Sequence, residues 1–89
     1  MPSIDAEIVN KLGLHARASA KLTQLAGGFD AEIWLSRSGR RVNAKSIMGV
    51  MMLAAAQGAA IVIETDGPDE EEAMRAVAAL VAGRFEEDE

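Results

Sequence analysis

The spacing of apolar residues alternates along the chain between the two-residue period of a strand and the three-to-four-residue period of a helix. In a chain of 89 residues each such element must be short. The whole can enclose only one hydrophobic core, so we predict a single domain over residues 1–89.

Four segments have the character of strands. They cover residues 3–9, 30–36, 40–43 and 61–65. In the first, Ile4, Ala6 and Ile8 fall on one face and polar residues fall on the other, which predicts a strand with one wet face. Ser38-Gly39 is a turn signal between the second and third segments and predicts a hairpin.

Three segments have helical spacing. The first runs from Ala16 to the Gly27-Gly28 stop, with apolar positions at Ala18, Leu22, Leu25, Ala26 and Phe29. The second is the run AKSIMGVMMLAAA, which we expect to be broken by Gly49 and to close near Gly58, with Val50 and Leu53 in the core. The third follows Gly67-Pro68, has an acidic first turn, and carries a buried stripe of Ala73, Val77, Leu80 and Val81. The final EEDE is predicted to be a solvated, frayed end.

The predicted order is β-α-β-β-α-β-α. Strands in one layer and helices in the other form a two-layer α+β sandwich, with each helix burying one stripe against the same face of a largely antiparallel sheet. Periodicity alone leaves the order of the strands open.

Composition and charge exclude several functional classes. The absence of cysteine removes disulfides, thiolate nucleophiles and Cys-based zinc sites, and one histidine is too few for the usual His-rich metal site. A net charge of −5 opposes non-specific nucleic-acid binding. With neither a membrane-spanning run nor a signal pattern, we expect a soluble cytoplasmic protein that holds no metal or cofactor and does not insert into membranes.

His15 is the single histidine and lies at the predicted start of the first helix. The unpaired N–H groups there disfavour the imidazolium form and favour an anion beside the ring. Arg17 adds a guanidinium that can pair with a phosphoryl oxygen. A neutral ring nitrogen, an anion-binding helix end and a nearby arginine suit phosphoryl transfer to histidine.

These residues alone also fit a purely structural role or a different chemistry. His15 can be an ordinary residue at a helix start and Arg17 a solvated charge. A hydrolase would instead need Ser19 paired with His15 and a carboxylate to orient the ring, and no acidic residue lies close in the sequence.

Two motifs narrow these alternatives. GLHARAS and NAKSIMGVMML, at this separation, resemble the HPr family of histidine-containing phosphocarriers of the bacterial phosphoenolpyruvate-dependent phosphotransferase system. The resemblance implies an open-faced sandwich with strand order 1-4-2-3 and three helices on one face. It also implies a phosphoryl carrier rather than an enzyme. His15 would accept the phosphoryl group on Nδ1 from enzyme I and pass it to enzyme IIA proteins, and Arg17 would stabilise it.

The second motif carries a further set of implied roles. Ser46 corresponds to the serine that HPr kinase/phosphorylase modifies in many members, although a serine there is also a good helix N-cap. Ile47, Met48 and Met51 either are partly exposed and form a Met-rich contact patch for several partners or belong to the core. Arg37, Arg40, Arg41 and Lys45 form either a basic rim that steers acidic partners or a solvated hairpin tip. A monomer suits a diffusing carrier.

Two features depart from the family pattern. Ala18 stands where proline is usual, which removes a residue that favours the first helical turn. NKLGLHAR, GGFDAEIWL and the acidic third helix also resemble NPr, the nitrogen-branch relative, whereas AKSIMGVMML resembles HPr. The downstream branch therefore stays open, as does a non-catalytic adaptor controlled by phosphorylation of Ser46.

Overall fold

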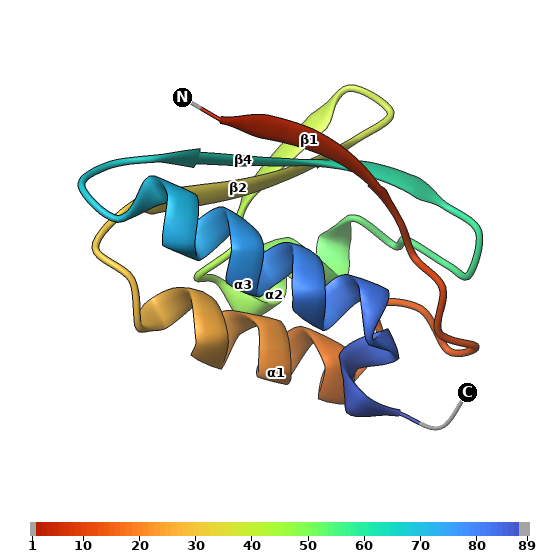
Figure 1. Ribbon diagram of the computed structural model, residues 1–89. Helices are drawn as coiled ribbons and strands as arrows, with labels where there is room; N and C mark the ends of the chain where they lie inside the picture. Colours follow the sequence, from red (N-terminus) through yellow and green to blue (C-terminus); the bar gives the residue numbers. More distant parts are fainter. Residues whose placement is uncertain (1, 88–89) are drawn as a thin grey trace.

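The computed structural model describes residues 2–87 as one sheet covered by helices (Figure 1). The elements are β1 (Ser3–Glu7), α1 (Ala16–Gly27), β2 (Glu32–Arg37), β3 (Arg40–Asn43), α2 (Ile47–Met52), β4 (Ala60–Asp66) and α3 (Glu70–Ala82). A 3-10 turn, Arg84–Glu86, follows the last helix. The predicted order of strands and helices is confirmed.

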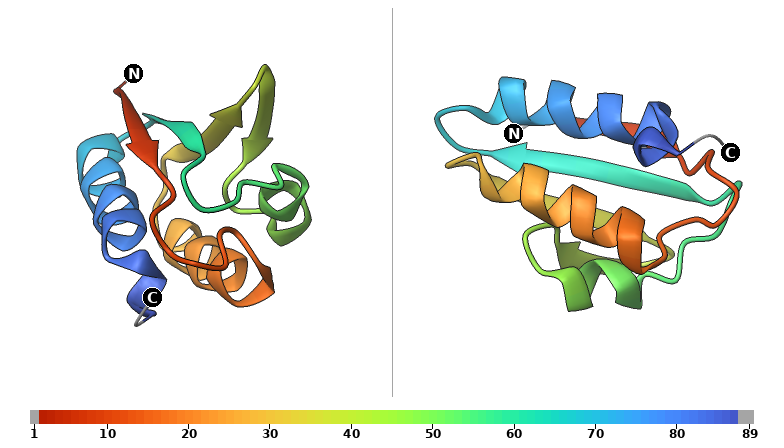
Figure 2. Two further views of the ribbon diagram at one scale, coloured as in Figure 1. Left: turned by 90° about the vertical axis from the view of Figure 1, so that its right-hand side faces the viewer. Right: turned by 90° about the horizontal axis from the view of Figure 1, so that it is seen from below.

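The sheet is antiparallel and its strands are ordered β1-β4-β2-β3. Ile63 of β4 pairs with Ile4 on one side and with Leu35 of β2 on the other, and Leu35 also pairs with Val42 of β3. All three helices lie on the same side of this sheet (Figure 2). The fold is therefore the open-faced two-layer sandwich that the resemblance implies.

The core lies between the sheet and the helices. The sheet contributes Ile33, Leu35, Ile61 and Ile63; α1 contributes Ala18, Leu22 and Ala26; and α3 contributes Ala73, Met74, Val77 and Val81. These side chains are buried because they recur at the period of their own element and therefore share one face. The predicted stripes are confirmed at most positions. Leu25, Phe29 and Leu80 are only half-buried, and Met74 is a core residue that the pattern missed.

The second helix is much shorter than predicted, and this prediction was wrong in two ways. Gly49 lies inside α2 and does not break it, and the helix ends at Met52, well before Gly58. Ala54 has a left-handed φ of 51°, which turns the chain so that the carbonyl of Ala55 accepts a hydrogen bond from Leu14 N–H. This tertiary contact outweighs the helix propensity of the Ala54–Ala56 run.

β1 also ends earlier than predicted, at Glu7 rather than residue 9. It is an edge strand, because only β4 pairs with it. Ile4 is therefore 37% exposed although it shares a face with the buried Ile8. The alternation identified the face correctly and the edge position reduced its burial.

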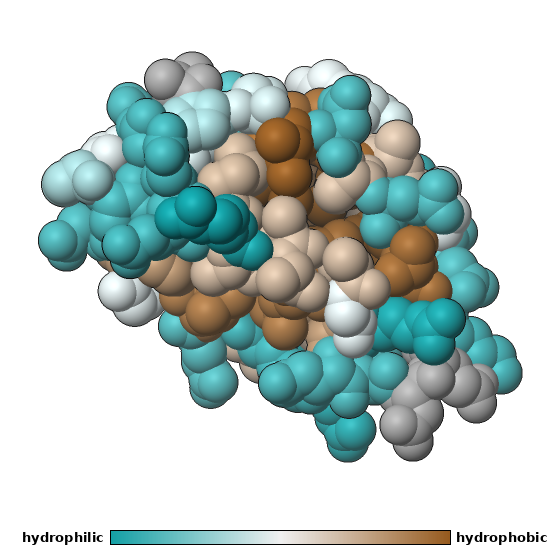
Figure 3. Space-filling model, viewed as in Figure 1, coloured by the Kyte–Doolittle hydropathy of each residue, from teal (hydrophilic) through white to brown (hydrophobic). Residues whose placement is uncertain are grey.

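The outer surface of the helical layer is partly apolar. Atoms over α3 and between α3 and α1 are mainly apolar, with hydrophilic groups on either side (Figure 3). A shallow hollow there is lined by Leu25, Ala76, Ala79, Leu80, Gly83 and Glu86. Most of these side chains are small, so the hollow offers few polar groups that would orient a ligand.

Candidate phosphoryl-acceptor site

His15 is the N-cap residue of α1, as predicted. Its backbone is extended (φ −76°, ψ −180°), and its carbonyl accepts the first helical hydrogen bond from Ser19 N–H at 2.9 Å. Its side chain makes no capping hydrogen bond and is 28% exposed. The ring therefore stands at the helix start without occupying the helix N–H groups.

The preceding loop fixes the direction from which the chain enters α1. Gly13 has a left-handed φ of 66°, and a Cβ there would lie 2.5 Å from the carbonyl oxygen of Ala55. Leu14 is buried and donates its N–H to that oxygen at 2.9 Å. Only glycine fits this close approach of two backbones, so His15 sits on a firmly held loop.

The start of α1 keeps its positive character. Its first turn contains no acidic residue. Arg17 is exposed in that turn, and no hydrogen bond or ion pair joins its side chain to another residue of the described range 2–87. Unpaired N–H groups, the helix dipole and a free guanidinium together favour an anion at this place.

Glu87 contacts His15, which corrects the prediction of a frayed tail. Nε2 of His15 lies 2.5 Å from Oε2 of Glu87, and the Glu87 side chain is only 14% exposed. Glu86, the first residue of the predicted tail, is 75% exposed as predicted, and residues 88–89 lie outside the described residues. Phe85, an apolar residue within this acidic segment, is the sequence signal that could have revealed the contact. It is fully buried and so holds the segment against the core.

The electrostatics of this contact favour a charged carboxylate. The hydrogen bond with His15, and then the one donated by Asn10, hold the pKa of Glu87 below its usual value. A carboxylate whose pKa is lowered in this way stays ionised through the neutral range. The ring of His15 therefore faces a negative charge on its Nε2 side.

The hydrolase alternative is not supported by the geometry. Ser19 is fully buried and donates its hydroxyl to the carbonyl of Leu14 at 3.2 Å. The hydroxyl is thus used within the loop–helix junction. A serine nucleophile needs an exposed hydroxyl in contact with the histidine base.

Ser46 is the N-cap of α2, as predicted from the sequence. Its exposed hydroxyl accepts a hydrogen bond from Gly49 N–H at 3.2 Å. This capping role accounts for a serine at the position by itself. The position is also open to solvent, as a modified residue must be.

Exposed apolar side chains of α2, together with Leu12 of the loop before His15, make up a set that we call the α2 patch. Its members are Leu12, Ile47, Met48, Met51 and Met52, whose exposed fractions run from 39% at Ile47 to 68% at Met48. The exposure predicted for Ile47, Met48 and Met51 is confirmed, whereas Leu12 and Met52 were missed. Val50 and Leu53 are buried, as predicted for the inner side of this segment.

The basic residues near the hairpin have structural contacts. Arg37 and Arg40 donate hydrogen bonds to the carbonyls of Leu53 and Met52, at the C-terminal end of α2. Arg41 stacks 4.0 Å above the ring of Trp34. Positive charge at a helix C-terminus is stabilising, so the arginines of this group support α2 and the sheet.

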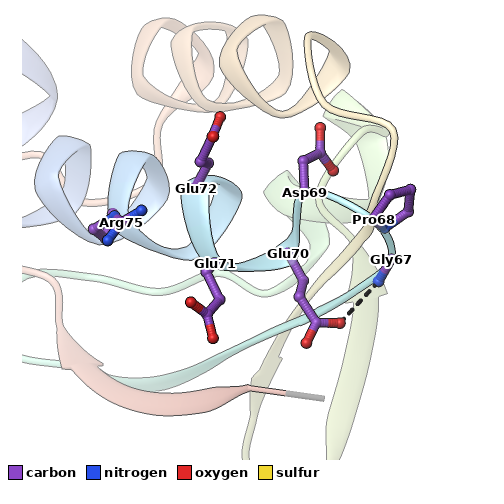
Figure 4. Close-up of a pocket in the computed structure, with 7 residues that line it drawn as sticks. All are labelled: Gly67, Pro68, Asp69, Glu70, Glu71, Glu72 and Arg75. Atoms are coloured by element: carbon purple, nitrogen blue, oxygen red, sulfur yellow. Dashed lines mark hydrogen bonds between the residues drawn. The ribbon is translucent and has the colours of Figure 1, made fainter.

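Negative charge is concentrated at the start of α3 (Figure 4). Asp69 accepts hydrogen bonds from the N–H groups of Asp30 and Ala31, and Glu70 accepts one from Gly67 N–H at 3.0 Å. The remaining carboxylates point in different directions and do not converge on one point (Figure 4). The acidic turn therefore serves to fasten loops to α3.

Residues 2–87 contain neither a metal-binding cluster nor a membrane-spanning helix. Within that range, no group of three or more His, Asp or Glu side chains is arranged to hold a metal ion. The helices described are all too short or too polar to cross a membrane.

Comparison with known proteins identifies the family. Residues 2–83 match the family model described as the PTS HPr component phosphorylation site. The chain is 67% identical to the phosphocarrier protein HPr of Cupriavidus necator, with 96% of each chain covered, and 48% identical to the phosphocarrier protein NPr of Escherichia coli, with 92% of each covered. The crystal structure of HPr-C-His from Thermoanaerobacter tengcongensis superimposes with a TM-score of 0.96 at 43% identity, covering 100% of both chains. The chain therefore belongs to the HPr family of phosphocarrier proteins of the phosphotransferase system.

Proposed function

We propose that His15 is the residue that carries the phosphoryl group, received from enzyme I and passed to an enzyme IIA protein. The observation that carries this proposal is the position of the single histidine at the uncapped start of α1, in a chain of a phosphocarrier family. The side chain of His15 is 28% exposed, which fits a carrier that reacts while docked to partner enzymes. It would work as a cytoplasmic monomer.

Arg17 stabilises the phosphoryl group in this proposal. Its guanidinium is exposed, lies in the first turn of α1 and is not engaged by another described residue. Arginine binds phosphoryl oxygens through charge-assisted hydrogen bonds. Together with the helix N–H groups, it would supply the charge stabilisation on which phosphoryl transfer depends.

The α2 patch is the docking surface for the partner proteins in this proposal, centred on Ile47, Met48 and Met51. Exposed methionines adapt to surfaces of different shape, which suits a carrier with several partners. Leu12, in the loop before His15, is also exposed, at 67%. A partner seated here would lie close to the phosphoryl group.

Ser46 is the regulatory site in this proposal, modified by HPr kinase/phosphorylase. It is exposed at the start of α2 and adjoins Ile47 of the docking surface. A phosphate there would place about two negative charges beside an apolar contact and weaken docking. The modification thus acts on partner binding and leaves His15 itself unchanged.

The branch served is the HPr type rather than the nitrogen type in this proposal. The support is the higher identity to HPr of C. necator, at 67%, than to NPr of E. coli, at 48%. Transfer rates to enzyme IIA proteins of the two branches test this choice. Faster transfer to the nitrogen-type acceptor would reverse it.

Incubation with enzyme I and phosphoenolpyruvate tests the central proposal. The protein should gain one acid-labile phosphate, and the His15→Ala variant should gain none. Arg75→Ala, which removes an exposed charge on α3, is a control that should be phosphorylated normally. Equal labelling of wild type and His15→Ala would overturn the proposal.

Incubation with ATP and HPr kinase tests the regulatory site. An acid-stable phosphate should appear and be lost in Ser46→Ala. If the wild type gains no phosphate from an active kinase, Ser46 is only a helix cap. If it gains phosphate at Ser46 but none at His15 from enzyme I, the chain is an adaptor rather than a carrier.

A further inference from the structure

The last turn of the chain is held in an unusual backbone conformation. Arg84, Phe85 and Glu86 have φ values of 60°, 53° and 65°, which are left-handed and unfavourable for residues with a Cβ. Phe85 is fully buried, and its carbonyl accepts a hydrogen bond from Lys21 of α1 at 2.8 Å. Three such residues in succession persist only where surrounding contacts hold them.

This turn delivers Glu87 to a position between two side chains of the acceptor loop. One carboxylate oxygen accepts a hydrogen bond from Nδ2 of Asn10 at 3.0 Å, and the other lies 2.5 Å from Nε2 of His15. Both oxygens of Glu87 are therefore used, and each contacts a residue more than seventy positions away in the chain.

Asn10 is itself fixed. It is fully buried, and its Nδ2 also donates to the carbonyl of Gly13 at 2.8 Å, so both of its acceptors are oxygens. No described residue donates a hydrogen bond to its buried Oδ1. The two hydrogen bonds donated by Nδ2 hold the Asn10 side chain between Gly13 and Glu87.

The contact with Glu87 decides which ring nitrogen carries the proton. An ionised carboxylate only accepts hydrogen bonds, so Nε2 of His15 must be the donor. In a neutral imidazole the other nitrogen, Nδ1, then carries the lone pair. We propose that Glu87 is a positioning residue that holds His15 as the Nε2–H tautomer and thereby presents Nδ1 as the nucleophile.

The transfer step balances without moving a proton. The lone pair of Nδ1 forms the new N–P bond, while the bond from phosphorus to the phosphorylated atom of the donor protein breaks and its electron pair returns to that atom. The ring of His15 keeps Nε2–H and gains positive charge, which the Glu87 carboxylate stabilises. This inference rests on the proposed role of His15 as phosphoryl acceptor.

Within residues 2–87, charged groups of α1 act on Glu87. His15 faces it from the start of α1, and Lys21 of α1 also acts on its carboxylate. Nζ of Lys21 lies 3.5 Å from the carboxylate of the neighbouring Glu86, whose side chain is 75% exposed. Glu86 carries the same charge one residue earlier and pairs with Lys21 rather than with His15, which makes it a matched control.

The Glu87→Gln variant tests the proposal sharply. Because Asn10 presents an N–H group, the carbonyl oxygen of the substituted side chain should turn towards Asn10 and its NH₂ group towards His15. Nε2 would then accept rather than donate, and the ring would change to the Nδ1–H tautomer. Nitrogen-15 NMR of the unphosphorylated protein at neutral pH reports this change directly, and the Glu86→Gln spectrum should match the wild type.

Phosphorylation kinetics provide the second readout. In Glu87→Gln the maximal rate of phosphorylation by enzyme I should fall about tenfold or more, because a wrong tautomer removes the reactive lone pair. The KM for this protein should change little, since Glu87 lies outside the α2 patch. Glu86→Gln should keep the wild-type rate.

The possible outcomes distinguish a failure of the role of Glu87 from a failure of the proposed phosphoryl acceptance by His15. A wild-type Nδ1–H tautomer, or a Glu87→Gln variant with an unchanged tautomer and rate, overturns the role of Glu87. A wild type that takes no phosphate from enzyme I overturns the proposed function, whatever the tautomer. Circular dichroism of both variants, each of which replaces a carboxylate by an amide of the same shape, establishes that they are folded.

Discussion

The starts of α1 and α3 have the same backbone dipole and opposite surroundings. The first turn of α3 contains Glu70, Glu71 and Glu72, whereas that of α1 contains no acidic residue. Asp69 and Glu70 bind backbone N–H groups of neighbouring loops, while the ring of His15 leaves the N–H groups of α1 unbound. One helix uses its positive end for stability, and the other leaves it open for an incoming anion.

The largest expected effect comes from removing the positive side chain at the open start. Arg17→Ala should lower the rate of phosphoryl acceptance by about ten- to a hundredfold, because a charge-assisted hydrogen bond contributes about 1.5–3 kcal/mol. A quenched time course of phosphorylation by enzyme I and phosphoenolpyruvate measures the rate of phosphoryl acceptance. Arg17→Lys should recover part of that rate. A wild-type rate in Arg17→Ala would show that Arg17 is a solvated charge with no role in transfer.

Making α1 resemble α3 should separate function from stability. Ala16 is exposed in the first turn, so Ala16→Glu places a carboxylate at the open end without disturbing the core. The free energy of unfolding should rise by about 0.3–1 kcal/mol. The rate of phosphoryl acceptance should fall about tenfold, because the new charge repels the incoming phosphoryl group.

Ala16→Gln is the neutral control for that change and should leave the rate near that of the wild type. Urea unfolding and phosphorylation are measured on the same samples. A rise in both stability and rate would show that the helix end does not bind the anion.

The start of α2 lies between these two cases, since a neutral hydroxyl caps it. Ser46→Ala should lower the free energy of unfolding by about 1 kcal/mol, because Gly49 N–H loses its acceptor. Ser46→Asn, which keeps a capping oxygen, should retain most of the stability. Phosphorylation of His15 should be unaffected in both, and a loss in Ser46→Ala would show that the two sites are coupled.

The smallest expected effect is the pH dependence of stability at the start of α3. Hydrogen bonds from the N–H groups of Asp30 and Ala31 hold the pKa of Asp69 below its usual value. The stabilisation is therefore present above the unfolded pKa of about 4 and is lost as the pH falls through the lower folded value.

Asp69→Asn removes that dependence. At neutral pH its thermal midpoint should be a few degrees below that of the wild type. The difference should shrink as the pH falls from about 4, the unfolded pKa, through the lower folded pKa, where Asp69 in the folded protein becomes neutral. A difference that stays constant from neutral to acid pH would assign the effect of the substitution to packing.

Local patterns predicted the parts of the fold that local physics controls. The change of period at Ala16, the turn at Ser38-Gly39 and the cap at Ser46 all follow from neighbouring residues, and the structure confirms each. The end of α2 could not be predicted in this way, since it depends on the carbonyl of Ala55 meeting Leu14 from another part of the chain.

In the acceptor site, too, the residues that are neighbours in sequence were predicted and the distant one was not. The helix start, His15 and the free Arg17 are neighbours in sequence and were predicted together. Glu87 was missed because its contact with His15 spans 72 positions and depends on a left-handed turn that sequence periodicity does not encode. An acidic end looks solvated until the burial of Phe85 is known.

The placement of Glu87 has a practical consequence for anyone who handles this protein. The end of the described chain lies beside the start of α1, whereas Ser3 begins β1 at the far end of the sheet (Figure 1). A bulky label attached close to Glu87 would therefore lie in the neighbourhood of His15 and, under the proposed function, hinder the approach of enzyme I. Labels joined before Ser3 leave that approach clear and are the appropriate choice for transfer assays.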